Sequence, residues 1–363
     1  WILAAAKCVN DKVWKNVYWP DYACLWIVPA AAKALELFEM EKYGTVISVS
    51  DPVSSHLVGK KVKSVYHDIK WIVDIGDPFC FREDTPPNNY RLYDNLNIRS
   101  ERKIFGLADS ISVTCQPTAT KYSQMFPEFK DKIVVIPPLL SMNRRGKVAT
   151  PFFHQGSKIR LLYVGTLYRA IRSPKFLLTL FEQLLEIMPH EEIELHFIGG
   201  NDECVEHFQP YARLLDKNIF LHGLLGRNRV TQAMEEADVL VNIGNHNRYQ
   251  LPSKVVEYVS LGKPILNLTT IEDDSSRDFF AGYPAMLNLH DHGKAPSEQA
   301  VKGLKEFINK LPFNIDQNYL TGLKKRFQVD TISAAYAGLV SGVREPVAAI
   351  DHRKLEESEA PAL

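Results

Sequence analysis

Short apolar runs rich in β-branched residues alternate with amphipathic segments along most of the chain. Such runs predict buried strands of parallel sheets, and the amphipathic segments between them predict helices that cover both faces of those sheets. Strands are predicted near residues 45–50, 71–75, 110–114 and 133–136 in the first half, and near 159–164, 193–198, 219–222, 239–243, 264–268 and 285–289 in the second. The pattern therefore predicts the α/β fold class, with two Rossmann-like domains, each built on a parallel sheet.

The two groups of strands are separated by the polar segment 141–150, which has the composition of an interdomain linker. We expect residues 1–145 to form an N-terminal domain and residues 150–330 to form a C-terminal domain. Helical spacing continues through 331–350, whereas 351–363 is charged, poor in large apolar residues and expected to fray.

Composition narrows the classes of function. The 43 basic and 43 acidic residues cancel, so no global field attracts nucleic acid, and we expect no nucleic-acid partner. Five cysteines without a close pair suggest neither a disulfide framework nor a zinc site, which fits a reducing cytosol. No apolar run approaches the roughly 20 residues that span a bilayer. We therefore expect a cytoplasmic protein, either soluble or peripheral at the inner face of the membrane.

The segment 251–266 places one carboxylate, Glu257, on a short helix between two predicted buried strands. Pro252 and Ser253 begin this helix and Gly262 ends it. Ligands of open parallel sheets bind at the carboxyl ends of the strands, where such a helix presents N–H groups and an acceptor. The alternative is a solvent-exposed pair of Glu257 with Lys254 at i, i+3 spacing.

The sequence of residues 251–266 resembles that of the family 4 glycosyltransferases of the GT-B fold, especially members that assemble bacterial surface polysaccharides. The segments 160–168, 193–200, 219–224 and 237–241 follow in that family's order, and 70–79 and 101–113 are similar to its acceptor-domain segments. The resemblance implies two Rossmann-like domains facing a central cleft, with the 331–350 helix crossing back to the N-terminal domain. It also implies that 1–7 is the second strand of that domain, so the first strand and its glycine-rich loop would lie upstream.

Family membership implies a retaining, hexosyltransferase-type and metal-independent enzyme of polysaccharide biosynthesis. Its donor would be a nucleotide-diphosphate sugar, its acceptor a hydroxyl of a glycan or lipid-linked glycan, and it would need no cofactor. Three alternatives stay open: a sugar-nucleotide epimerase of the GT-B fold, a two-domain binding protein of the periplasmic type, and a catalytically degenerate partner subunit that binds nucleotide sugars.

The resemblance assigns donor-binding roles in the second half. Glu257 would accept from the ribose hydroxyls, beside Ser253 and Lys254 at the helix start, and Leu224 would lie at the nucleobase. Many members carry a second glutamate at the position of Tyr249, so Asn245 and His246 are its expected substitutes. The diphosphate and the close approach of the backbone are assigned to the following residues: Gly165, Thr166, Arg169, Arg172, Lys175 and Gly200. For each of them a plain loop or solvated surface charge is the competing interpretation.

Asp77 and Arg172 are the candidate catalytic residues. Asp77 follows the strand 71–75, in a loop that points toward the reacting sugar in family members, although an Asx turn before Pro78 is the commoner use of such an aspartate. Asp74, near the end of that strand, is a weaker candidate. The charges of 101–109, Glu101 among them, are expected to be solvated. We expect no metal site, because the nearest acidic cluster, 272–276, has the pattern of a helix start.

Overall fold

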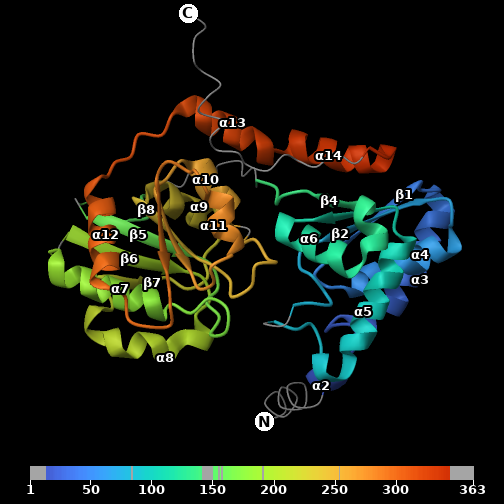
Figure 1. Ribbon diagram of the computed structural model, residues 1–363, viewed down its shortest axis with the longest axis horizontal. Helices are drawn as coiled ribbons and strands as arrows, with labels where there is room; N and C mark the ends of the chain where they lie inside the picture. The colour runs from blue at the N-terminus through green and yellow to red at the C-terminus, as the bar shows by residue number, and fades with distance from the viewer. Residues whose placement is uncertain are drawn as a thin grey trace, which may run out of the picture. The chain divides into compact units, whose positions relative to one another are not determined.

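The computed structural model describes residues 14–82, 85–140, 150–153, 156, 158–189, 192–252 and 254–343. The chain divides into two compact units, Trp1–Pro137 with Asp330–Val347, and Pro138–Val329 with Ala348–Leu363. Each unit carries its own parallel sheet (Figure 1), so the predicted α/β class with two parallel sheets is confirmed. The predicted linker before Thr150, the frayed tail, the opening strand at 1–7 and Ser253 lie outside the described residues.

The first unit is built on a sheet of four parallel strands in sequential order. These are β1 (Thr45–Ser50), β2 (Lys70–Ile75), β3 (Ser110–Val113) and β4 (Ile133–Val135). The helices of this unit are α2 (Lys15–Val17), η2 (Cys24–Trp26), α3 (Ile27–Glu41), α4 (Ser54–Val65), α5 (Tyr90–Leu107), α6 (Gln116–Met125), η3 (Pro127–Lys132) and α14 (Val329–Ser341). Three consecutive residues of β2, Trp71, Ile72 and Val73, are fully buried, as expected for a strand covered on both faces.

Helix α14 packs on the sheet of the first unit although it follows the second unit in sequence. Its buried residues Ile332 and Leu339 join one apolar cluster with Ile72, Val134 and Ile136 from β2 and the β4 region. The Lys70 ammonium donates to the Val340 carbonyl at the end of the helix. The helical pattern near 331–350 thus corresponds, in its described part, to a helix that completes the core of the first unit.

The second unit is built on a sheet of six parallel strands in the order β10-β9-β8-β5-β6-β7. Their bounds are β5 (Ile159–Val164), β6 (Ile193–Ile198), β7 (Ile219–Leu221), β8 (Val239–Ile243), β9 (Ile265–Thr269) and β10 (Met286–His290). The helices are α7 (Lys175–Ile187), η5 (Asp202–Cys204), α8 (Val205–Phe208), η6 (Gln209–Leu214), α9 (Arg227–Glu236), α10 (Lys254–Leu261), α11 (Ser275–Phe280), α12 (Glu298–Asn309) and α13 (Gln317–Phe327).

Helices cover both faces of this sheet, so that the unit has three layers with the sheet in the middle (Figure 1). Helices α7 and α12 pack on one face, and α9, α10 and α13 pack on the other. The chain lays down β5, β6 and β7 in one direction and then returns to add β8, β9 and β10 beyond the other edge of β5. The strand order therefore reverses between β5 and β8, and ligands of open α/β sheets bind at the carboxyl ends of the strands at such a switch point.

In the described part of the chain, no helix combines the length and the apolar character needed to cross a membrane.

Candidate functional site

The switch point of the second unit is organised by a buried tyrosine. The hydroxyl of Tyr258, in α10, accepts from the Val164 amide at the end of β5 (3.2 Å) and donates to the Val241 carbonyl in β8 (3.3 Å). Its side chain is fully buried. One side chain thus ties the first turns of α10 to both strands at the point where the strand order reverses. The residue before it in this helix is Glu257.

Glu257 is half-buried and forms an ion pair with Lys254. Its Oε2 lies 2.8 Å from Lys254 Nζ, and the Glu257 side chain keeps 20% of its surface exposed. The pair anticipated as the local alternative is therefore present. A helix pair of this spacing contributes a few tenths of a kcal/mol, whereas each hydrogen bond to a charged group contributes about 1.5–3 kcal/mol. A ligand that offers two hydroxyls would outweigh the pair with Lys254.

Glycines bring the backbones after β5, β6 and β7 close together. The Gly165 amide donates to the Ile198 carbonyl (2.9 Å), and the Gly199 amide donates to the Gly223 carbonyl (2.8 Å). A Cβ on Gly199 would lie 2.1 Å from the Gly165 oxygen, and the φ of Gly199 is +137°. Of the two neighbouring glycines, Gly199 makes the tighter approach, toward the protein backbone, whereas a Cβ on Gly200 would lie 3.3 Å from the Thr166 side chain.

Arg172 and Asn245, both predicted from the sequence, are brought together from the loops after β5 and β8. The Arg172 Nε–H donates to Asn245 Oδ1 at 2.7 Å. Asn245 is 2% exposed, whereas its neighbour His246 is exposed. Of the two residues expected to substitute for a second glutamate, Asn245 is therefore the one built into the site.

The other predicted residues of the β5 loop are arranged differently. Arg169 is exposed and pairs with Glu206 of α8, with 2.6 Å between Nη2 and Oε1. Lys175 is exposed at the first residue of α7. The Thr166 carbonyl accepts from the Tyr163 hydroxyl at 3.2 Å, which fixes the turn that follows β5. Within this loop, Arg172 is the cation directed toward the switch point.

Leu224 and Tyr249 lie in the loops after β7 and β8. Leu224 is 82% exposed and follows Gly223, whose φ is +65°. The backbone N–H of Tyr249 donates to Asn247 Oδ1 in a tight turn (3.1 Å), and the Tyr249 side chain is half-buried. The turn around Asn247 thus sets the direction in which Tyr249 leaves the backbone.

Two buried groups near the site were not predicted as site residues. The Tyr163 hydroxyl hydrogen-bonds to Arg172, and burial raises the pKa of Tyr163 to about 12. Asp274 is 1% exposed and caps α11, and burial raises its pKa. A Cβ on Gly244 would lie 2.2 Å from Asp274 Oδ2, so this aspartate packs against the start of the β8 loop. The polar tip of Tyr163 in the otherwise apolar run 161–164 was the available sequence signal.

The acidic cluster 272–276 begins a helix, as its pattern predicted. Asp274 Oδ1 accepts from the Ser276 amide at the start of α11. Within the ranges that the structure describes, no three His, Cys, Asp or Glu side chains converge as they would around a metal ion.

In the first unit, one arginine holds two carboxylates at the carboxyl ends of β1 and β2. Arg82 Nη1 lies 3.1 Å from Asp77 Oδ2 and 3.4 Å from Asp51 Oδ2, and the Arg82 side chain is only 9% exposed. Burial raises the pKa of Asp51, an effect opposed by Arg82. Asp74 instead accepts from the Ser112 hydroxyl (2.8 Å) inside the unit. Asp77 is therefore better placed than Asp74 to meet a ligand.

The expectation that Glu101 is solvated is wrong. Its side chain is 4% exposed and accepts from the Cys80 amide (3.0 Å) and from the Tyr122 hydroxyl (2.5 Å). Burial raises the pKa of this carboxyl group. The physical reason is that α5 turns a face containing Ile104 and Phe105 into the core, and Glu101 lies on that same face.

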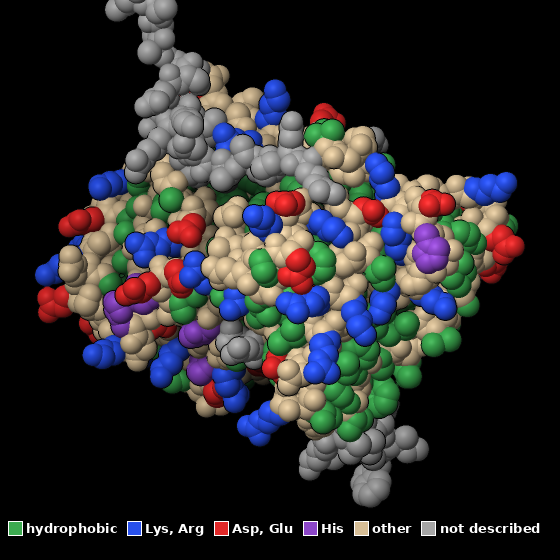
Figure 2. All heavy atoms as spheres, turned by 45° about the vertical axis from the view of Figure 1, so that its right-hand side comes forward, with side chains coloured by type: hydrophobic (Ala, Val, Ile, Leu, Met, Phe, Trp, Pro, Cys, Tyr) green, Lys and Arg blue, Asp and Glu red, His purple; other side chains and the backbone are tan. Residues whose placement is uncertain are grey.

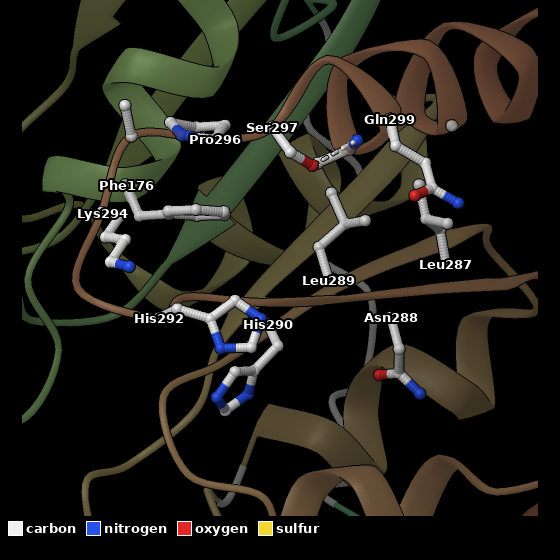
Figure 3. Close-up of a pocket in the computed structure, with 13 residues that line it drawn as sticks. Phe176, Leu287, Asn288, Leu289, His290, His292, Lys294, Pro296, Ser297 and Gln299 are labelled. Carbon is white, nitrogen blue, oxygen red and sulfur yellow. Dashed lines mark hydrogen bonds between the residues drawn. The ribbon is translucent and has the colours of Figure 1, made fainter.

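A separate cavity of about 700 Å³ lies beside the edge strand β10 and the first turns of α12. Figure 3 shows His290 and His292 close together below Leu289, with Lys294 on the side of Phe176 and with Asn288 and Gln299 at the other end. The two histidine rings lie 4.4 Å apart between centroids. None of the predicted donor residues lines this cavity.

The comparison with protein families matches only part of the second unit. Residues 158–274 match the family described as Glycosyl transferases group 1. This segment contains β5, the loop of Arg172, β8, Asn245 and Glu257. No curated protein matches the chain.

Solved structures match over most of the chain at low identity. The GtfA/B complex has a TM-score of 0.57 at 14% identity, over 86% of this chain and 60% of that one. MnaA of S. aureus with UDP has a TM-score of 0.51 at 14% identity, over 91% and 85%. The lipopolysaccharide outer core galactosyltransferase WaaB has a TM-score of 0.51 at 15% identity, over 88% and 81%.

The chain spans 60% of the length of the GtfA/B chain that it matches. At identities this low, the likeness concerns the fold alone. The chain thus has the GT-B type of α/β fold, and its segment 158–274 is similar to glycosyl transferases group 1.

Proposed function

We propose that the protein is a retaining glycosyltransferase that moves a hexose from a nucleotide-diphosphate sugar to a hydroxyl of a glycan or lipid-linked glycan, in polysaccharide biosynthesis. The observation that carries the proposal is the hydrogen bond between Arg172 and Asn245 at the β5/β8 switch point, where Tyr258 also ties α10, the helix of Glu257, to both strands. All of these residues lie inside the segment that matches glycosyl transferases group 1. UDP in the similar MnaA structure and galactosyl transfer by the similar WaaB support this choice of donor and reaction.

Each of these residues would bind a different part of the donor. Glu257 accepts from the two ribose hydroxyls, and Arg172 donates forked N–H groups to the diphosphate. The start of α10, with Lys254, adds N–H donors and positive charge, and the backbone around Leu224 borders the nucleobase. Arg169 and Lys175 contribute positive potential from the loop margin, and His246 and Tyr249 border the hexose.

Transfer with retention asks the protein to stabilise charge and to hold the reactants. The bond from the anomeric carbon to the diphosphate oxygen breaks, a bond to the acceptor oxygen forms on the same face, and the departing phosphate takes the acceptor proton. Arg172 stabilises the charge that develops on the diphosphate. Asp77, held by Arg82, binds an acceptor hydroxyl on the first unit. No step in this scheme requires a metal ion, so we expect activity to survive a chelator.

The test of the donor site uses Glu257→Gln, which keeps the shape of the side chain and removes its charge. We expect kcat/KM for the donor to fall about a hundredfold, because two charge-assisted bonds are lost. Donors are first found by thermal stabilisation with a panel of nucleotide sugars, since ligand at 100 times its Kd adds about 2.7 kcal/mol.

A 2′,3′-dideoxy analogue of the bound nucleotide separates the ribose role from a general loss. The wild type should bind the analogue far more weakly than the parent nucleotide, whereas Glu257→Gln should bind both alike. Glu186→Gln, on the exposed surface of α7, is the matched control and should leave both affinities unchanged. Equal discrimination by wild type and Glu257→Gln would exclude the ribose role.

We further propose that the protein works in the cytoplasm at the inner face of the membrane. The first unit exposes Leu25, Trp26 and Val28 to 75%, 51% and 77%, and a groove of about 490 Å³ beside α3 is bordered by Lys60 and Lys61. Figure 2 shows hydrophobic side chains gathered at the lower right of the face it draws, with basic side chains nearby. Apolar side chains next to lysines fit an anionic bilayer surface.

Cosedimentation with vesicles tests this placement. We expect binding to phosphatidylserine-containing vesicles, loss of binding in high salt, and loss in a Val28→Asp variant. Binding that is equal for neutral and anionic vesicles, or unchanged by Val28→Asp, would speak against it.

A further inference from the structure

Arg172 is held by one side chain from β5 and one from the loop after β8. Its Nε–H donates to Asn245 Oδ1, at 2.7 Å, from the loop after β8. Its guanidinium also hydrogen-bonds to the hydroxyl of Tyr163, in β5, and this hydroxyl in turn donates to the Thr166 carbonyl. Tyr163 and Asn245 are 3% and 2% exposed. The guanidinium therefore has a fixed position relative to both strands of the switch point.

The orientation of Asn245 is itself determined by its surroundings. Its Nδ2–H donates to the Gln250 carbonyl (3.0 Å), which also accepts from the Ser275 hydroxyl (2.8 Å). Because the nitrogen of the amide is used toward Gln250, its oxygen faces Arg172. The network thus extends from the first residue of α11 through the Gln250 carbonyl and Asn245 to the guanidinium.

Both partners of Arg172 are uncharged. An amide oxygen accepts a hydrogen bond without neutralising the cation, and a phenol with its pKa raised to about 12 stays protonated at neutral pH. Arg169, in the same loop, is instead compensated by Glu206 at 2.6 Å. Among the described residues, none forms an ion pair with Arg172. The arrangement fixes one arginine and leaves its full charge to be met by an anion.

We propose that Tyr163 and Asn245 are positioning residues that preorganise Arg172 for the diphosphate of the donor. The inference rests on the proposed function and adds to it a specific requirement. Ordering of the arginine is complete before the ligand binds, so the gain from this arrangement should appear in the affinity for the diphosphate and not in the affinity for the nucleoside.

Two variants test the positioning role by calorimetric titration. The probes are whichever of ADP, CDP, GDP, UDP and dTDP binds the wild type most tightly, and the corresponding nucleoside. We expect Asn245→Ala to weaken the diphosphate about tenfold and the nucleoside less than about twofold, given the usual value of one hydrogen bond. Tyr163→Phe keeps the buried ring and should weaken the diphosphate about threefold, again with little effect on the nucleoside.

Double-mutant cycles show whether the two residues act through the arginine. If they do, Arg172→Ala combined with Asn245→Ala or with Tyr163→Phe should bind the diphosphate no more weakly than Arg172→Ala alone. Arg213→Ala is the matched control, because Arg213 pairs with Glu182 on the exposed side of α7. Far-UV circular dichroism confirms that each variant is folded.

The outcomes separate the inference from the proposed function. Additive losses in the cycles, or equal losses of nucleoside and diphosphate, would overturn the positioning role alone. Failure of the wild type to bind any of the five nucleotides would overturn the proposed function together with this inference.

Discussion

Glu101 shows how one buried ionisable side chain ties stability to pH. Its carboxyl group is enclosed by the first unit and its pKa is raised by burial. A carboxyl whose folded pKa exceeds its unfolded pKa binds more protons in the folded state. Its contribution is therefore fully present below the unfolded pKa, near 4.5, and is lost as the pH rises toward the folded pKa.

Glu101→Gln should remove this dependence, because an amide does not ionise. We expect the free energy of unfolding of the variant, relative to the wild type, to improve between pH 5 and pH 8 by about 1 kcal/mol or more. Urea unfolding of both proteins at both pH values measures this difference in free energy. The contributions of the other titrating groups, which both proteins share, cancel in it. Glu128→Gln, an exposed residue paired with Arg102, serves as the control. A difference that stays constant with pH would contradict the raised pKa.

Glu101 also marks the limit of sequence reasoning at the residue scale. Its charge suggested a solvated position, and the neighbouring pattern did not reveal that Cys80 and Tyr122 would offer donors to it. The pairing of Arg172 with Asn245 joins residues 73 positions apart and depends on β8 lying beside β5. Local spacing could nominate both residues, but only the strand order could bring them together.

Whole elements were predicted more accurately than side-chain contacts. The bounds of β1, β5, β6 and β8 agree with the prediction, β2, β3, β4 and β7 differ from it by one residue at one end, and β9 and β10 are shifted by one residue. A strand buried on both faces needs apolar residues at every position, so its signal is local and does not depend on its partners. This local pattern does not predict the order of the strands in the sheet, and it does not predict where the backbones of neighbouring loops come into close contact.

Gly199 is such a position and gives a prediction for the β5–β6 edge. In Gly199→Ala the new Cβ would lie 2.1 Å from the Gly165 oxygen at a φ of +137°. We expect a loss of about 3 kcal/mol or more in the free energy of unfolding of the second unit, from strain and displacement of the backbone. Urea unfolding followed by far-UV circular dichroism measures the loss.

Gly303→Ala is the matched control on α12. A Cβ there meets nothing within 4 Å, so the substitution should stabilise the helix by about 0.5–1 kcal/mol. If Gly303→Ala lowered the free energy of unfolding as much as Gly199→Ala, the loss at Gly199 could not be attributed to the close approach of the backbone.

At the scale of the whole molecule, the two units carry separate cores and separate optical probes. All five tryptophans lie at or before Trp71, within the first unit, whereas the proposed nucleotide residues lie in the second. Tryptophan fluorescence therefore reports on the first unit, and a nucleotide acts on the second.

We expect a nucleotide at 100 times its Kd to raise the melting temperature of the second unit by about 5–10 °C, as followed by circular dichroism. The transition followed by tryptophan fluorescence should move much less. Equal shifts of both signals would mean that the units unfold together, and no shift in either would contradict nucleotide binding.

The tie between Tyr258 and Val164 joins residues 94 positions apart in the chain. During synthesis, the loop of Arg172 therefore leaves the ribosome well before α10. A nascent chain released before α10 has the arginine but neither Glu257 nor the tyrosine that ties this helix to β5 and β8, so under the proposed function it should not hold a donor.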